Sequence, residues 1–173
     1  MLIVGAYYDG FYKFVLVLHI LCAIIGFGAV FLNMVYSLEM RKHPGPGGLA
    51  IFDANFRVSE IAQYFIVAVF VLGCALVGLS DSVIEFSQTW IWLAMLLFVI
   101  AFGISHGVLR PALKRMRVLM GEMQENPPSM EGGVMPPQVT EMIGLAKRIA
   151  PTGLILDLFL IAILCLMVWR PGF

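Results

Sequence analysis

The sequence is poor in charged residues. Asp, Glu, Lys and Arg make up 13% of its 173 residues, whereas hydrophobic residues make up 61%. Soluble globular domains carry about 25% charged residues, so this composition excludes an ordinary water-facing surface. Eleven basic residues balance eleven acidic ones, and a net charge of zero provides no bulk attraction to nucleic acid. We therefore expect a protein of the lipid bilayer that does not bind nucleic acid.

Several familiar motifs are also missing. The three cysteines, Cys22, Cys74 and Cys165, lie inside apolar runs and form neither a CxxC pair nor a zinc-binding pattern. The first ten residues lack the basic segment of a secretory signal. The glycines at 26–28 and 45–48 lack the preceding strand, or the Lys and Ser/Thr, of a phosphate-binding loop. These absences leave no recognisable soluble-enzyme site.

What the sequence does contain is four long apolar runs, at about 11–36, 62–79, 89–109 and 152–169. A helix needs about 20 apolar residues to cross a hydrocarbon core about 30 Å thick. Since lipid offers no partner to an unpaired backbone group, each run must be helical; we expect the second to be entered through a helix that starts near Asp53. The sequence predicts an all-α membrane protein, a four-transmembrane-helix bundle that forms a single polytopic domain over residues 1–173.

Charge is segregated between the connections. Nine of the eleven basic residues flank the first and third connections, at positions 41, 42, 57, 110, 114, 115, 117, 147 and 148. The positive-inside rule assigns these connections to the cytoplasm. Trp90, Trp92 and Trp169 fall at the opposite interface, as an aromatic belt would. We therefore expect both termini outside, and a multi-pass protein of the bacterial cytoplasmic membrane.

The basic connections have their own character. Residues 42–48 are rich in Pro and Gly and predict an irregular connection, and residues 125–137 hold four prolines and predict a mobile linker. Short amphipathic helices are expected on both sides of that linker, the second ending at Pro151. Basic residues of the first one could contact anionic lipid headgroups or could serve only as topology signals: Arg110, Lys114, Arg115 and Arg117.

His19 is the first ionisable residue within a span. A stripe of small and polar residues at helical spacing includes it: His19, Cys22, Ala23, Gly26, Val30 and Asn33. Small residues let membrane helices approach closely, so this face is predicted to be the packed one. Two interpretations of His19 stay open, an axial ligand of haem iron or another metal, and a histidine hydrogen-bonded to a neighbouring helix.

Glu60, His106 and Asp157 are predicted at similar depth in the inner half of the bilayer. Ionisable groups within a membrane cost about 2.5–3.5 kcal/mol each on insertion scales, so they persist where they find partners or serve a function. One hypothesis is a proton-relay or cation site made by the three residues. The other is mutual neutralisation that fixes helix register, with Arg57 and Glu60 as a local pair.

The two histidines of the spans are predicted to lie far apart. His19 belongs to the outer half and His106 to the inner half, which separates them by roughly 15 Å along the membrane normal. Ligand atoms on one metal must lie within about 4 Å of each other, given bonds near 2 Å. We therefore do not expect one haem iron to be bridged by both.

The segment Leu18-His-Ile-Leu-Cys-Ala-Ile-Ile-Gly-Phe-Gly28 resembles the first span of a bacterial family of integral membrane proteins, the domain-of-unknown-function 2269 family (DUF2269). Further phrases of this resemblance are found at 54–57, 85–92 and 103–107, and it covers nearly the whole chain. The Leu-His pair is more distantly similar to HemJ-type protoporphyrinogen oxidases and the CopD copper-resistance domain. That likeness implies haem ligation by His19, although the intramembrane Lys expected as its partner has no counterpart here.

Three functional hypotheses follow. The first is a small redox-type membrane protein that binds haem b through His19. The second is proton or cation handling through Glu60, His106 and Asp157. The third is a non-catalytic subunit or assembly factor, with a membrane-protein partner or a second copy of the chain, whose polar residues only hold helices together.

Overall fold

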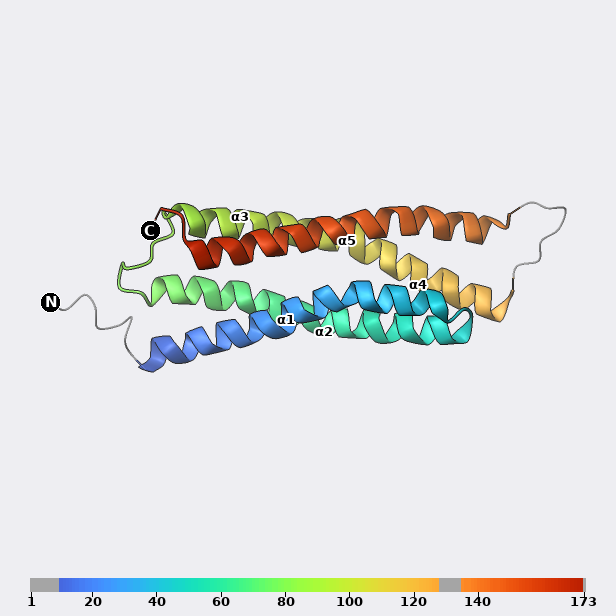
Figure 1. Ribbon diagram of the computed structural model, residues 1–173, viewed down its shortest axis with the longest axis horizontal. Coiled ribbons are helices and arrows are strands. Elements are labelled where there is room, and N and C mark those ends of the chain that lie inside the picture. Colours follow the sequence, from blue (N-terminus) through green and yellow to red (C-terminus); the bar gives the residue numbers. More distant parts are fainter. Residues whose placement is uncertain (1–9, 128–134, 173) are drawn as a thin grey trace.

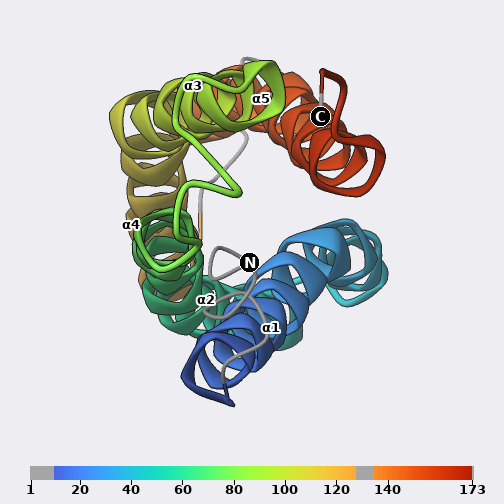
Figure 2. The same cartoon turned by 90° about the vertical axis from the view of Figure 1, so that its left-hand side faces the viewer.

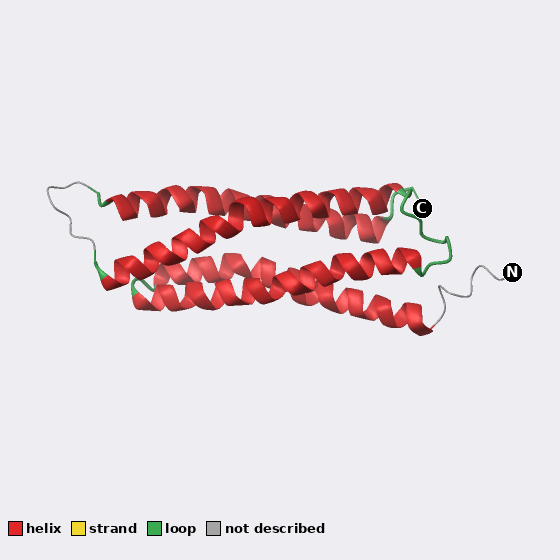
Figure 3. Ribbon diagram, turned by 180° about the vertical axis from the view of Figure 1, so that it is seen from behind, coloured by secondary structure: helices red, strands yellow, loops and turns green. Residues whose placement is uncertain are grey.

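The computed structural model describes residues 10–127 and 135–172, and every regular element in these ranges is helical (Figure 3). Helices of 16 to 33 residues are joined by short connections, apart from one five-residue π-helical segment, η2. Their bounds are α1 (Gly10–Lys42), α2 (Pro46–Gly78), α3 (Thr89–Ile104), η2 (Ser105–Leu109), α4 (Arg110–Glu125) and α5 (Pro137–Trp169).

Four helical rods are long and apolar enough to cross a membrane, because α3, η2 and α4 run on as one rod over Thr89–Glu125. The start of α1 and the end of α5 lie at the same end of the molecule (Figure 1). We call this end, with Gly10, the 79–88 connection and Trp169, the terminal end. The opposite end, with Lys42, α4 and Pro137, is the basic end. The predicted all-α membrane fold is confirmed.

The helices are longer than the predicted spans. A helix of 33 residues measures about 50 Å at about 1.5 Å per residue, more than the hydrocarbon thickness of about 30 Å. The second begins at Pro46 rather than near Asp53, and the 42–48 connection shrinks to residues 43–45, where Gly45 has a φ of 74°. Hydropathy marks only the stretch in contact with lipid, whereas the backbone continues as helix until a breaker stops it.

The amphipathic stretches at the basic end are extensions of the long rods. α4 follows directly from η2, and residues 137–150 form the start of α5, which runs through Pro151 without ending. Pro151 is exposed and removes only one backbone donor. Most of the predicted linker at 125–137 lies outside the described residues, which leave out 128–134.

Proline explains the irregular turn in the third rod. Pro111 has no N–H for the carbonyl of Gly107, and its ring would collide with that carbonyl in a regular helix. The helix widens instead, and the Arg110 N–H donates to the carbonyl of Ser105, five residues earlier. One extra residue in a turn rotates all later side chains by about 100°. The π segment therefore sets the direction in which the basic residues of α4 point.

The rods pair as two antiparallel hairpins (Figure 2). α1 packs along α2, α3 packs on α5, and α4 bridges the hairpins by packing on both α2 and α5, whereas α1 touches α5 sparsely. The hairpins also meet where the Phe70 and Phe98 rings stack with centroids 4.7 Å apart. Small apolar clusters close the terminal end, around Tyr12, Val15 and Leu76 and around Trp90 and Ile91.

Much of the apolar surface of the rods is exposed in the single chain, which suits helices surrounded by lipid. All three tryptophans lie at the terminal end, as predicted, but they differ in exposure. Trp92 and Trp169 are exposed, whereas Trp90 is buried and its Nε1–H donates to Oε1 of Gln88 at 3.1 Å. Trp90 is therefore a packing residue of the protein interior rather than part of a lipid-facing belt.

Candidate functional site

His19 lies in the contact between α1 and α2. The ring is half-buried beside Gly73, where a Cβ would lie 3.3 Å from Cε1 of His19, and it interacts with the backbone of Val69. Its Nδ1 is buried without a hydrogen-bond partner. Gly73 leaves the space that the imidazole fills, so the absence of a side chain on α2 positions the ring.

Two further members of the predicted stripe contact α2. Gly26 is buried against Ile66, and Oδ1 of Asn33 accepts a hydrogen bond of 3.1 Å from Oγ of Ser59. Residues between the stripe positions, such as Ile24 and Leu32, are exposed. The prediction that this face of the first span is the packed one is confirmed, and its partner is α2.

The surroundings of His19 fit a haem in one respect and fail in another. An unpaired buried nitrogen suits a metal ligand. However, α1 and α2 are in van der Waals contact at Gly73, so the flat macrocycle has no room between them. Haem ligation by His19 would require the two helices to separate.

Asp157 lies in the span of α5, half-buried, on the same side of the helix as the buried Leu160. The exposed Leu154 and Ile161 lie one turn before and one turn after it on the same face, so Asp157 is at the border between the protein-facing and lipid-facing sides of α5. Among the described residues, Asp157 has no hydrogen bond and no ion pair. The carboxyl group thus lies at the edge of the packed side of α5 and is not neutralised by a protein partner among the described residues.

His106 belongs to η2, and its orientation is well defined. Its ring packs on Phe102, with centroids 4.0 Å apart, and its Nδ1 lies 3.0 Å from the Phe102 carbonyl. A carbonyl oxygen only accepts, so Nδ1 carries the proton in this bond. The neutral ring then presents Nε2 as its acceptor. π-helical turns are frequent at functional sites, and here the turn carries the only histidine of the third rod.

Glu60 has a different partner from the one predicted. Its Oε1 lies 3.1 Å from Nη2 of Arg110, at the start of α4. The side chain of Arg57, in contrast, is exposed. The predicted local pair of Arg57 and Glu60 is therefore wrong. The sequence did not indicate this pairing because it depends on the rotation that η2 gives to α4.

The three residues proposed as an inner cluster divide into two groups. The ion pair of Arg115 with Glu141, and the groove that Leu97 and Ala162 line together, indicate the antiparallel register and put His106 and Asp157 about 8 Å apart along the helix axes. Glu60 is taken up by Arg110. Within residues 10–127 and 135–172, no three His, Cys, Asp or Glu side chains gather closely enough to hold a metal ion.

The depth of the two histidines follows from similar contacts. His19 lies level with Gly73, and His106 lies one turn before Arg110, which is level with Glu60. Gly73 and Glu60 are thirteen positions apart on α2, which is about 19.5 Å along the helix axis. Subtracting the turn of about 5.4 Å between His106 and Arg110 gives an axial separation of about 14 Å between the two histidines. The packing thus agrees with the separation of roughly 15 Å that the sequence predicts.

Ion pairs tie α4 to its neighbours. The Arg117 guanidinium makes two hydrogen bonds to the Asp53 carboxylate, at 2.7 and 3.2 Å, and Arg115 makes two to Glu141, at 2.7 and 2.9 Å. The hydrogen bond from Arg115 holds the pKa of Glu141 below its usual range. Together with Arg110 and Glu60, these pairs bring three of the four candidate lipid-binding bases into intramolecular contacts, whereas Lys114 is exposed without an ion pair in the described chain.

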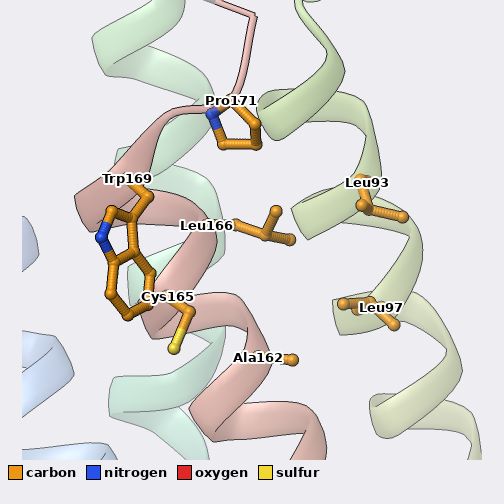
Figure 4. Close-up of a pocket in the computed structure, with 7 residues that line it drawn as sticks. All are labelled: Leu93, Leu97, Ala162, Cys165, Leu166, Trp169 and Pro171. Carbon is orange, nitrogen blue, oxygen red and sulfur yellow. The ribbon is translucent and has the colours of Figure 1, made fainter.

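A groove that the sequence did not indicate lies between α3 and α5 at the terminal end (Figure 4). Its volume is about 300 Å³, and it is lined by apolar side chains, among them Leu93, Leu97, Cys165 and Leu166. We call it the terminal groove. No sequence motif predicts this groove, because it depends on how two uniformly apolar helices are placed against each other.

A family model described as "Predicted integral membrane protein (DUF2269)" matches residues 13–171. No curated protein and no solved structure is significantly similar to the chain. The match covers most of the sequence and confirms the resemblance seen in the first span. The more distant likeness to HemJ-type and CopD proteins stays a prediction.

Proposed function

The chain belongs to the DUF2269 family of predicted integral membrane proteins, and from that premise we propose that it handles protons through Asp157, with His106 as the second titratable group. The protein is an integral, multi-pass membrane protein. By the positive-inside rule we place its basic end in the cytoplasm and both termini outside, in a bacterial cytoplasmic membrane. The two residues then belong to the inner half of the bilayer.

The observation that carries the proposal is the unpaired carboxyl group of Asp157. An acidic side chain at this depth costs about 2.5–3.5 kcal/mol on insertion scales. An ion pair would explain it as a structural lock, but Asp157 has no such partner within the described chain. A costly group that does not stabilise the packing is best explained by a function. A single carboxylate suits a proton better than a metal ion, which needs several oxygen or nitrogen ligands.

His106 supports the proposal by its depth and its fixed orientation. It lies about 8 Å from Asp157 along the helix axes, too far for direct transfer, so water would have to link them. Its Nδ1–H is held by the Phe102 carbonyl, which leaves Nε2 to accept a proton. An imidazole has one nitrogen that can donate a proton and one that can accept a proton, as a relay between a membrane carboxyl group and the cytoplasm must.

Proton flux into liposomes tests the proposal. A potassium diffusion potential would drive protons, and an enclosed pH-sensitive dye would report them. We expect Asp157→Asn to abolish the flux and His106→Gln to reduce it. Asp81→Asn is the matched control, because Asp81 lies in the exposed connection at the terminal end. The proposal would be contradicted if liposomes with the wild-type protein took up protons no faster than empty liposomes. It would also be contradicted if the Asp157→Asn variant gave the same proton flux as wild type.

Stability provides an independent readout. If Asp157 serves function rather than packing, Asp157→Leu should raise resistance to unfolding while removing flux, because the cost of the carboxyl group disappears. A structural role predicts the opposite, a less stable variant. This comparison also tests the third hypothesis, a non-catalytic subunit, in which every polar residue of the spans would hold helices together and a stable partner should copurify.

Haem binding through His19 remains a second candidate, supported by the unpaired Nδ1. It requires α1 and α2 to open at Gly73. Protein purified after expression with haem supplied should then show a Soret band that shifts on reduction and is lost in His19→Ala. A colourless wild-type preparation would remove this candidate. For anionic lipid, the exposed Lys114, Lys147 and Arg148 are better placed than the paired arginines of α4.

A further inference from the structure

We infer that the terminal groove holds an acyl chain of a phospholipid from the leaflet at the terminal end. The inference is independent of proton handling, because Asp157 is not among the residues that line the groove. It is based on the lining, the position and the size of the groove, and on a positive charge beside it.

The lining suits hydrocarbon. The side chains of Leu93 and Leu97 on α3 face Ala162 and Leu166 on α5 across the groove, with Cys165 at its side (Figure 4). All the exposed lining surface is apolar, so water entering the groove would meet no exposed polar atom to hydrogen-bond with. Apolar cavities stay dry or bind apolar molecules. An alkyl chain matches this lining at every point.

The position suits the upper part of a lipid chain. Trp169 and Pro171 line the end of the groove that lies nearest the terminus of α5. Tryptophans mark the level of the lipid headgroups, and the exposed Trp92 lies at the same end of the molecule. The groove thus extends from the headgroup level into the hydrocarbon, as an acyl chain does.

A positive charge stands next to the groove. Arg170 lies between the two lining residues Trp169 and Pro171, in a left-handed conformation with φ of 42°. Its guanidinium carbon lies 5.4 Å from the centroid of the Trp90 ring, and its Nε–H donates to the Met167 carbonyl at 3.4 Å. This charge complements the phosphate of a lipid whose chain enters the groove.

The size decides between occupants. A volume of about 300 Å³ is at the lower limit of small-molecule sites. A partner helix is about 10–12 Å across with its side chains and cannot enter between α3 and α5. A single acyl chain can enter the groove, and the phospholipids that diffuse past it carry such chains.

Photocrosslinking in nanodiscs tests this inference on the full chain. The probe is a phosphatidylglycerol with a diazirine in the upper part of one acyl chain, and peptide mass spectrometry maps the adducts. We expect several-fold more crosslinking at Leu93 and Leu97 than at Val99, which is exposed to lipid on the same helix. Equal yields at the three positions would overturn the inference, and this comparison needs no variant.

A pair of variants sharpens the test. Ala162→Phe fills the groove, whereas Ile161→Phe adds the same side chain to the lipid-facing side of the same helix, one residue away. Crosslinking in the groove should be lost in Ala162→Phe and kept in Ile161→Phe. Native mass spectrometry of wild type should also show a retained phospholipid, which Ala162→Phe lacks. Retention that is unchanged in that variant, or recovery of an isoprenoid compound in place of a phospholipid, would overturn the assignment.

Discussion

Replacing Gly26 by alanine tests the close contact of α1 with α2, on which the position of His19 depends. A Cβ on Gly26 would lie 3.0 Å from Cγ1 of Ile66, 3.3 Å from the Ile66 backbone nitrogen and 3.4 Å from Cβ of Phe65. Cγ1 of Ile66 can move only by a change of χ1, which a helix restricts for Ile, and the backbone of α2 cannot move aside. The added methyl group would therefore push the two helices apart.

The magnitude follows from two opposing effects. Alanine is favoured over glycine within a helix by about 1 kcal/mol, whereas overpacking a close contact costs about 1–3 kcal/mol. Gly28→Ala is the matched control, because Gly28 is exposed on the same helix and a Cβ there meets nothing within 4 Å. Helix propensity cancels between the two variants. We expect Gly26→Ala to be less stable than Gly28→Ala by about 1–3 kcal/mol, or about 5- to 150-fold in the unfolding equilibrium constant.

Unfolding of both variants by SDS in mild detergent, followed by circular dichroism and tryptophan fluorescence, measures this difference. Gly26→Ala should cost less in an Ile66→Ala background than in wild type, since Ile66→Ala removes the Cγ1 contact and leaves the backbone contact. A Gly26→Ala variant as stable as Gly28→Ala, or more stable, would refute the assigned packing of α1 on α2. It would also remove the reason for placing His19 in that contact.

Three further predictions concern the polar contacts. Ser59→Ala should cost about 0.6 kcal/mol in the same unfolding assay, typical of a hydrogen bond between membrane helices, whereas Ser37→Ala, which removes a local bond within α1, should cost less. Arg117→Ala should speed hydrogen exchange in α4 more than Lys114→Ala, which removes an exposed base without an ion pair; equal effects would mean that the bridge to α2 is unimportant. The carboxyl group of Glu141 has a lowered pKa in the folded protein, so its ion pair stabilises above the unfolded pKa and this stabilisation is lost as pH falls through the folded value. Protection from hydrogen exchange at the contact of α4 with α5, measured relative to the intrinsic exchange rate at each pH, should therefore fall on acidification below about pH 4.5 in wild type, and Glu141→Gln should lower this protection already at neutral pH and flatten the pH dependence.

Several features could be predicted from local pattern alone. Unbroken apolar runs indicated four membrane-spanning helices, because hydrocarbon leaves a backbone no other structure. The spacing of small residues around His19 indicated the packed face of the first helix. Both inferences depend on properties of a single helix, its length in one case and its periodicity in the other, and the sequence displays these directly.

Other features depend on contacts between helices and were missed or left open. Glu60 pairs with Arg110 rather than with Arg57 because Pro111 forces a π turn that rotates α4. The ends of the rods are polar, so hydropathy does not detect them. The predicted spans are therefore shorter than the helices of the structure. Glu60 is separated from His106 and Asp157 for a similar reason, because a shared depth in the bilayer does not specify the direction in which each side chain points from its helix.

The sequence by itself therefore determined the membrane location, the helical class and the face of α1 that packs. Only the tertiary structure decided that α2 covers this face, that Asp157 has no partner in the described chain, and that α3 and α5 leave an apolar groove between them. The physical reason is that the hydrophobic effect sorts residues between water and lipid one helix at a time. The choice of partner helix depends instead on steric fit and polar contacts between residues far apart in the chain.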